Sequence, residues 1–234
     1  MFQKERFNCT MKNKKLLFFV ILLLPALFKI ILEFTTINSR KLPYYGPKTL
    51  VGEDTVYYEA GSGFKAFSNS KDNNAERSLT DIYLDTNRFP LFAISFIKPS
   101  YKNDNYRMAG LSEYAQYKKD KIKLIPFVVV SPCDGPQDNA CLNEFEKLKT
   151  GNPNIFTMYW KQSSFDSLNL TFFKGKPVHI DYSFFVLVDK NRHIRGYYDA
   201  RYVSEIKRLT EEYQHLRLKE EKQLIIKNNQ IENK

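Results

Sequence analysis

Apolar and polar positions follow their clearest pattern between residues 184 and 217. Residues 184–188 are a continuous aromatic and β-branched run, and residues 194–198 form a second short apolar run. Between them, residues 189–192 are polar turn formers, among which Asn191 can adopt a positive φ. The apolar positions that follow recur at three- and four-residue steps among charged ones: Val203, Ile206, Leu209, Tyr213 and Leu216. The pattern predicts a β-hairpin followed by an amphipathic helix.

The middle of the chain predicts an alternation of strands and helices. Apolar runs predict buried strands at 91–97, 122–130 and 155–160, and shorter extended segments are expected at 55–58 and 64–67. Spaced apolar residues predict helices at 106–120 and 142–149. This order predicts an α/β fold with a mixed sheet flanked by helices.

The N-terminal region carries a candidate membrane anchor. Residues 16–28 are unbroken apolar sequence, and 30–32 continue the run after Lys29, which together give roughly 17 residues, the lower limit for a spanning helix. A cleaved signal peptide is the alternative, but no A-x-A cleavage motif follows the run. Basic residues precede it, so the positive-inside rule predicts a single-pass cell-membrane protein with residues 1–15 in the cytoplasm. The C-terminal domain is then expected on the periplasmic or outer side.

The expected domain organisation follows from these segments. After an anchor at 16–34, we expect a juxtamembrane segment at 35–60, one folded domain at 61–218 and a charged tail at 219–234. Of the net charge of +10, residues 1–40 carry +5, and the rest is a mild surplus spread along the chain with a local cluster at Lys118, Lys119, Lys121 and Lys123. No nucleic-acid-binding motif accompanies that cluster, so no nucleic-acid partner is expected.

Two regions of the chain, the predicted hairpin and the expected juxtamembrane segment, contain sequences that resemble a known family. Residues 185–189 read FVLVD, residues 194–200 read IRGYYDA, and residues 42–47 read LPYYGP. These sequences resemble the SCO/SenC family of copper chaperones that serve cytochrome oxidase assembly. The resemblance implies a thioredoxin-like fold for this chain.

The same resemblance implies that the copper site has been lost. The family binds copper through two cysteines spaced CxxxC and a histidine shortly before the FVLVD strand, a donor set that suits this metal. The resemblance places Ser100 and Asp104 at the cysteine positions and Asp181 at the histidine position. His179 lies two residues earlier, on the same face of an extended strand, and stays a candidate ligand. We therefore expect no working metal site and no copper cofactor.

The cysteines indicate a structural crosslink. By the predicted topology Cys9 is cytoplasmic, whereas Cys133 and Cys141 lie together in an oxidising compartment, where a disulfide between them is expected. The alternative is a redox-active dithiol, although that chemistry favours a CxxC spacing at a helix N-terminus.

These features lead to three functional hypotheses. The first is a non-catalytic binding or assembly factor in the cell envelope, for which the resemblance implies a partner in respiratory oxidase assembly. The second is a thiol–disulfide oxidoreductase that uses Cys133 and Cys141. The third is residual copper binding through His179 and Asp181 with help from Asp104.

Overall fold

The computed structural model describes residues 23–25, 27, 41–61, 64–68, 76–78, 91–97, 107–133 and 155–232. Of the predicted anchor, Leu23, Leu24, Pro25 and Leu27 are described, and all are helical. Among the described residues, no helix combines the length and the apolar character that a membrane crossing requires. The chain divides into two compact units, Met1–Lys41 and Leu42–Lys234, and the sheets belong to the second.

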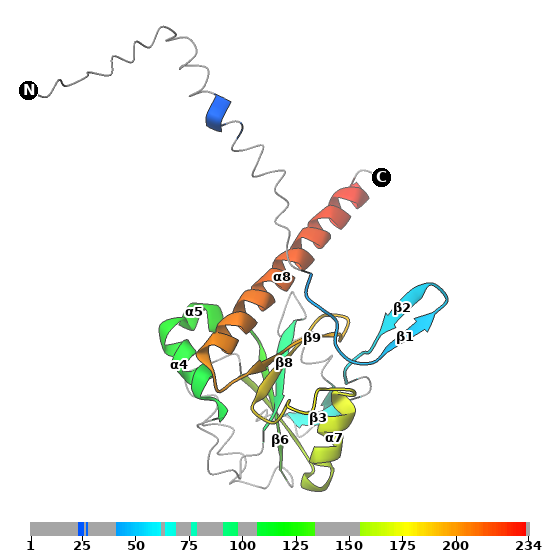
Figure 1. The fold of residues 1–234 in the computed structure, drawn as a ribbon, viewed down its shortest axis with the longest axis vertical. Coiled ribbons are helices and arrows are strands. Elements are labelled where there is room, and N and C mark those ends of the chain that lie inside the picture. Colours follow the sequence, from blue (N-terminus) through cyan, green and yellow to red (C-terminus); the bar gives the residue numbers. More distant parts are fainter. Residues whose placement is uncertain are drawn as a thin grey trace, which may run out of the picture. The chain divides into compact units, whose positions relative to one another are not determined.

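A mixed β-sheet forms the centre of the second unit (Figure 1). Within the described residues its strand order is β4-β3-β7-β6-β5-β8-β9, where β5, β6 and β7 run parallel and the other neighbours pair antiparallel. The strands are β3 (Lys65–Ser68), β4 (Glu76–Ser78), β5 (Phe92–Phe96), β6 (Phe127–Pro132), β7 (Ile155–Trp160), β8 (Phe184–Val188) and β9 (Ile194–Asp199).

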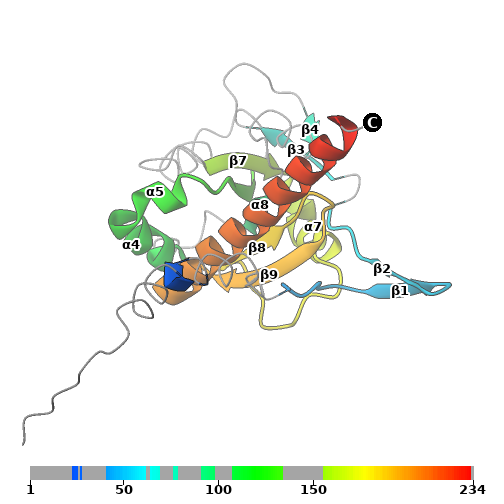
Figure 2. The ribbon, with the colours of Figure 1, turned by 90° about the horizontal axis from the view of Figure 1, so that it is seen from above.

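Helices cover both faces of this sheet. The described helices are α4 (Ala109–Tyr117), α5 (Lys119–Ile122), the short η1 (Gln162–Ser164), α7 (Phe165–Phe172) and α8 (Val203–Glu232). α4 packs against α8 on one face, and α7 covers the other. A separate hairpin, β1 (Lys48–Val51) and β2 (Asp54–Tyr57), extends away from the rest of the unit in both ribbon views (Figures 1 and 2).

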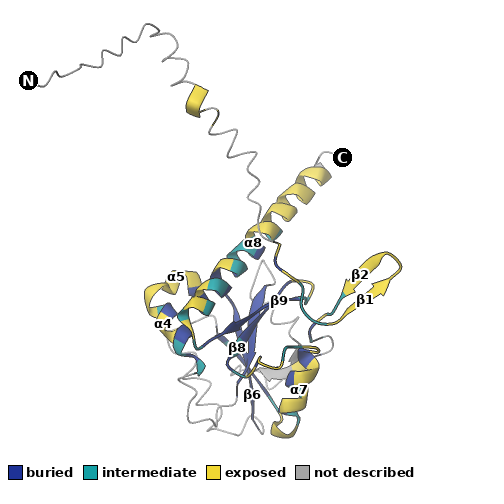
Figure 3. Cartoon of the chain, viewed as in Figure 1, coloured by how far each residue is buried: buried dark blue, intermediate teal, exposed yellow. Residues whose placement is uncertain are grey.

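Alternation along β5 divides its side chains between two hydrophobic cores. Ala93 faces the core under α4 and α8, whereas Phe92, Ile94 and Phe96 face the core under α7. Because both faces are covered, the central strands are continuous apolar runs instead of alternating ones. The exposure colouring agrees, since the sheet is dark while the β1–β2 hairpin and the end of α8 are exposed (Figure 3).

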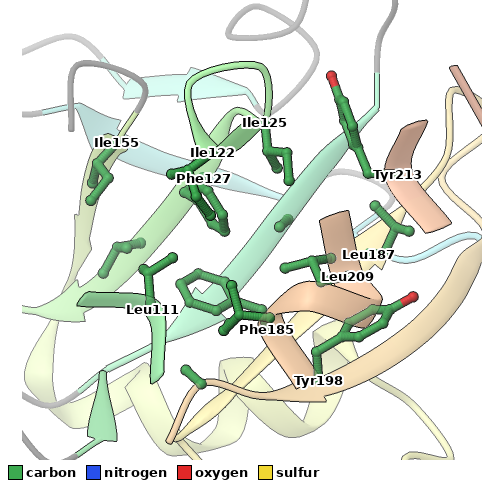
Figure 4. Packing of buried hydrophobic residues seen from close by; sticks show 14 of the residues in the cluster. Leu111, Ile122, Ile125, Phe127, Ile155, Phe185, Leu187, Tyr198, Leu209 and Tyr213 are labelled. Atoms are coloured by element: carbon green, nitrogen blue, oxygen red, sulfur yellow. The ribbon is translucent and has the colours of Figure 1, made fainter. Parts of the chain in front are cut away.

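The core under α4 and α8 is built largely from aromatic and branched side chains (Figure 4). Phe127, Phe185 and Leu209 are fully buried, and Tyr198 and Tyr213 pack beside them. Each such side chain contributes about 1.5–3 kcal/mol relative to leaving it exposed. The predicted stripe of the last helix therefore provides one wall of this core.

Several predicted elements are confirmed and others are corrected. β7 and β8 occupy the predicted residues, and β9 is one residue longer than predicted. The strand predicted at 122–130 begins only at Phe127, because Ile122 ends α5 and is buried from a helix. α7 was not predicted, and the tail expected at 219–234 continues α8 as far as Glu232. The helix predicted at 142–149 lies outside the described residues.

Candidate functional site

The turn between β8 and β9 is organised by the side chain of Asp189. Its Oδ1 accepts the N–H groups of Asn191 (2.9 Å) and His193 (3.0 Å), and its carbonyl accepts the N–H of Arg192 (2.8 Å). Arg192, with a φ of 63°, adopts the left-handed conformation. The positive φ is therefore at Arg192 and not at Asn191, whose N–H is held inside the turn by Asp189.

A β-bulge directly after this turn reorients Arg195. Val188 lies opposite Ile194 and Leu187 lies opposite Gly196, so Arg195 is the extra residue on β9. Bulges of this kind redirect a side chain out of the strand's regular alternation. Arg195 is only 6% exposed.

The guanidinium of Arg195 connects the two sequences that carry the family resemblance. Nη1 donates to Asp189 Oδ2 (3.0 Å), Nη2 to the carbonyl of Leu42 (2.7 Å) and Nε to the carbonyl of Pro43 (3.2 Å). Its Cζ also lies 4.0 Å from the centre of the Tyr44 ring. We call Arg195 with these partners the Arg195 clamp. It joins segments that are 153 residues apart in the chain.

The segment expected to be juxtamembrane packs on the domain beside this clamp. The N–H of Tyr45 donates to the carbonyl of Ile194 (3.0 Å), and the N–H of Ala60 donates to the carbonyl of Arg192 (2.8 Å). Arg192 also forms an ion pair with Glu59 at 2.5 Å. Leu42 onwards therefore belongs to the compact unit.

The end of this segment caps α7. The Tyr58 hydroxyl donates to the carbonyls of Thr171 (2.8 Å) and Phe172 (3.1 Å), two groups that the helix end leaves free. Gly61 has a φ of 69°, and a Cβ there would lie 2.2 Å from the ring of Phe172. Only glycine fits at this position.

The glycine of the IRGYYDA sequence has a packing role. A Cβ on Gly196 would lie 2.2 Å from the hydroxyl of Tyr198, two residues along the same strand. That hydroxyl donates to the carboxylate of Glu212 on α8. Burial, and then the bond to Glu212, raise the pKa of Tyr198. The Cζ of Arg208 lies 4.4 Å from the centre of the Tyr198 ring, and its Nη2 donates to the carbonyl of Tyr197 (2.8 Å) on β9, the last strand in the sheet order.

The position predicted for the family histidine has a structural use. Asp181 Oδ1 accepts the N–H of Ser183 (2.7 Å), and Oδ2 lies 4.0 Å from Nη1 of Arg201. His179 is exposed, and its ring centre lies 6.2 Å from that of Phe184. Burial lowers the pKa of Lys176, and the nearby Asp181 partly offsets this change.

The other two predicted positions, Ser100 and Asp104, lie outside the described residues. Across the ranges that the structure describes, no group of three or more histidine, cysteine, aspartate or glutamate side chains is arranged to hold a metal ion.

Cys133 directly follows β6 and is 1% exposed. Its N–H donates to the carbonyl of Trp160 (2.9 Å), and its sulfur is in a disulfide. The predicted partner, Cys141, lies outside the described residues, so the pairing stays a prediction. A buried and bonded sulfur differs from the exposed thiolate that redox catalysis uses.

The apolar pattern of the chain does not reveal the role of Arg195. Arg195 is a charged residue inside a predicted apolar strand, and a charge at such a position requires partners. That signal indicates a buried pairing, but it names neither the bulge nor the backbone carbonyls near Leu42.

Comparison with known proteins gives matches among solved structures alone. No family model matches the chain, and no curated protein does. A SCO1/SenC family lipoprotein from Bacillus anthracis is 12% identical, with a TM-score of 0.48 over 76% of this chain and 98% of that chain. BsSco, described as a member of the Sco family of cytochrome c oxidase assembly proteins, is 14% identical, with a TM-score of 0.43 over 65% of this chain and 94% of that chain. The thioredoxin domain of a thiol-disulfide oxidoreductase from Bacteroides vulgatus is 13% identical, with a TM-score of 0.39 over 62% of this chain and 91% of that chain.

The fold is thioredoxin-like. The order β6-β5-β8-β9, with two parallel strands followed by an antiparallel hairpin and helices on both faces, is the arrangement of that fold. Sco proteins are among the solved structures that the chain resembles, as the two sequence motifs predicted.

Proposed function

We propose that this chain is a membrane-anchored Sco-like protein without a working copper or redox site, and that it acts as a non-catalytic binding or assembly factor in the cell envelope. The observation that supports the proposal is a contrast between two parts of the same domain, the Arg195 clamp and the position of the lost metal ligand. The Arg195 clamp joins the Sco-like motifs into one framework. Asp181, which the resemblance places at the position of the metal-binding histidine, accepts the N–H of Ser183 and lies 4.0 Å from Arg201.

The donor chemistry at these positions does not fit copper. Soft Cu(I) is bound by thiolates and imidazoles, whereas Ser100, Asp104 and Asp181 offer hard oxygen atoms. His179 alone supplies one imidazole, and it is on the exposed loop before β8. A single nitrogen donor together with carboxylates has a low affinity for Cu(I).

The proposed partner is a component of respiratory oxidase assembly. We extend to this chain the role in oxidase assembly that is described for BsSco, a member of the Sco family of cytochrome c oxidase assembly proteins. A folded surface on a membrane tether suits binding or scaffolding without chemistry of its own.

A copper competition experiment tests the loss of the metal site. The full chain, purified in detergent and loaded with Cu(I), should give up the metal to a chelator of modest affinity. His179→Ala should behave like the parent chain, and His215→Ala, on α8, is the matched histidine control. Stoichiometric retention of copper that disappears in His179→Ala alone would refute the proposal and favour residual copper binding.

Two measurements test the proposed anchor. The protein should stay in the membrane pellet after a carbonate wash, and a reporter that is active only outside the cytoplasm should give signal when fused after residue 234. Release of a shortened soluble form would instead establish a cleaved signal peptide.

A further inference from the structure

A basic surface on and beside α5 plays no part in the proposed function. We call it the α5 patch: Tyr117, Lys118, Lys119, Lys121, Lys123 and Leu124, all of which are exposed. Tyr117 is 73% exposed and Leu124 is 44% exposed, which is high for apolar side chains of this size. Ile122, within this stretch, and Ile125, directly after it, are buried, and they hold this turn on the core.

The lysines of the α5 patch have no counter-charges of their own. Among the described residues, none of these lysines forms an ion pair with a carboxylate, and Asp120 is the one acidic residue within the patch. Four lysines against one aspartate give the stretch 118–123 a net charge of +3. On the β8–β9 turn and the packed part of α8, by contrast, several basic side chains are paired, as Lys190 is with Glu220 and Arg208 with Glu205.

The patch lies at the end of the sheet where the chain enters the unit. It precedes Phe127, which begins β6 and lies opposite Ala93 near the start of β5. At that same end of β5, Phe92 lies opposite Val188, the last residue of β8. The turn that follows Val188 is bonded through Arg195 to Leu42, the first residue of the unit. In Figure 1, α5 is at the end of the sheet from which the last turns of α8 leave.

We propose that the α5 patch docks on a bilayer surface that carries anionic lipid headgroups. Lysines near such a surface are attracted to it, and tyrosine and leucine beside them suit the interface between headgroups and acyl chains. The inference rests on the proposed anchor, because a tether that joins the unit at Leu42 brings this end of the sheet close to the membrane. A protein partner is less favoured, since recognition of a protein usually uses charge-depleted, aromatic and arginine-rich cores.

The test measures lipid contact at Tyr117 in the full chain. Tyr117→Trp is introduced together with Trp160→Phe, so that one tryptophan reports from the patch. The chain is reconstituted into phosphatidylcholine vesicles with or without about one third phosphatidylglycerol, and quenching by brominated lipids is recorded. The fluorescence of the tryptophan at position 117 should be quenched in vesicles with phosphatidylglycerol and less so in neutral vesicles. Added salt should also reduce the quenching, because it screens the attraction between the lysines and the anionic headgroups.

Neutralising the patch should abolish the lipid contact. Each lysine near an anionic surface shifts the ratio of docked to undocked protein by about fivefold, so changing Lys118, Lys119, Lys121 and Lys123 to Gln should remove the quenching. The matched control changes four exposed lysines elsewhere, Lys65, Lys161, Lys174 and Lys207, to Gln and should keep it.

The outcomes separate this inference from the anchor. Equal quenching in neutral and anionic vesicles, or in the patch variant and its parent, would overturn the proposal even if the chain resists carbonate extraction. The patch would then be a solvated surface or a site for an acidic protein. If carbonate releases the chain but vesicles with phosphatidylglycerol still bind it through the patch lysines, the inference stands and the anchor fails.

Discussion

At Arg195 a single side chain satisfies four partners at once. Its planar guanidinium donates to one carboxylate and two carbonyls and lies over the Tyr44 ring, an arrangement that a lysine ammonium does not reproduce. Both Arg195 and Asp189 are nearly excluded from solvent. The energetic importance of such a pair lies in what is left behind when one member is removed.

Truncating this side chain should therefore be costly. Arg195→Ala removes the guanidinium partner of the buried Asp189 carboxylate and should lower the free energy of unfolding by about 3–5 kcal/mol, measured by urea denaturation. Arg195→Lys should recover only part of this loss. Arg192→Asn is the control, because it removes the exposed ion pair with Glu59 and should cost at most about 1 kcal/mol. Similar effects of Arg195→Ala and Arg192→Asn would show that the clamp does not stabilise the domain.

Tyr197 provides a prediction on pH dependence. Its hydroxyl is buried and has no hydrogen-bond partner among the residues that the structure describes, and burial raises its pKa to about 12. The folded chain thus keeps its proton more tightly than the unfolded chain, whose tyrosines titrate near 10. The associated stability is fully present below pH 10 and is lost as the pH rises towards 12.

Tyr197→Phe should be neutral or slightly stabilising at pH 7, because it removes an unpaired hydroxyl. It should also reduce the loss of stability between pH 10 and pH 12, measured by thermal melts across that range. Tyr198→Phe is the contrasting variant, since it removes a bond to Glu212 and should cost about 1 kcal/mol at pH 7. A large destabilisation by Tyr197→Phe at pH 7 would mean that its hydroxyl is satisfied in solution.

On the scale of elements, α8 has two halves with different environments. Ile206, Leu209, Tyr213 and Leu216 pack on the sheet, and residues 221–231 are all exposed. Between these two parts, Glu220 forms an ion pair with Lys190 of the β8–β9 turn. Tertiary packing stabilises the first half, and the second half is helical as its continuation.

A pair of leucines on this helix tests the division. Leu209→Ala, at a fully buried position, should lower the free energy of unfolding by about 2–5 kcal/mol. Leu218→Ala changes the same residue type on the same helix, but Leu218 is 65% exposed and the effect should stay within about 0.5 kcal/mol. Both values can be measured by urea unfolding, and equal effects would mean that the second half of α8 is packed in solution.

On the scale of the whole molecule, long-range connections hold the ends of the unit together. Leu42 is buried in the core under α8, and Tyr58 caps α7. A more local constraint acts at the end of β6, where Cys133 is in a disulfide. A crosslink of this kind stabilises mainly by restricting the unfolded chain.

The combined substitution Cys133→Ser and Cys141→Ser should lower the stability of the domain by about 2–3 kcal/mol, read as a lower Tm. The disulfide should also resist glutathione, with a reduction potential below about −300 mV in a redox titration followed by alkylation. A potential above roughly −200 mV together with an unchanged Tm would contradict a structural role and favour the oxidoreductase hypothesis.

The elements with a local pattern could be predicted from the residues alone. β7, β8 and the packed stripe of α8 were predicted at their residues, because the spacing of apolar side chains reports directly on strands and helices. The resemblance of two short motifs also indicated the fold. An apolar run without a regular spacing is less informative about the type of element. Ile122 is an example, because a buried residue can belong to the end of a helix or to a strand.

How the separate motifs act together depends on tertiary contacts. The bulge at Arg195, the packing of Leu42 on the domain and the engagement of Asp181 by Arg201 each depend on where another part of the chain lies. A local pattern shows that a charge in an apolar strand needs partners, but it does not show which carbonyls are within reach. Those partners are set by the fold, because the sheet brings together residues that lie 153 positions apart in the chain.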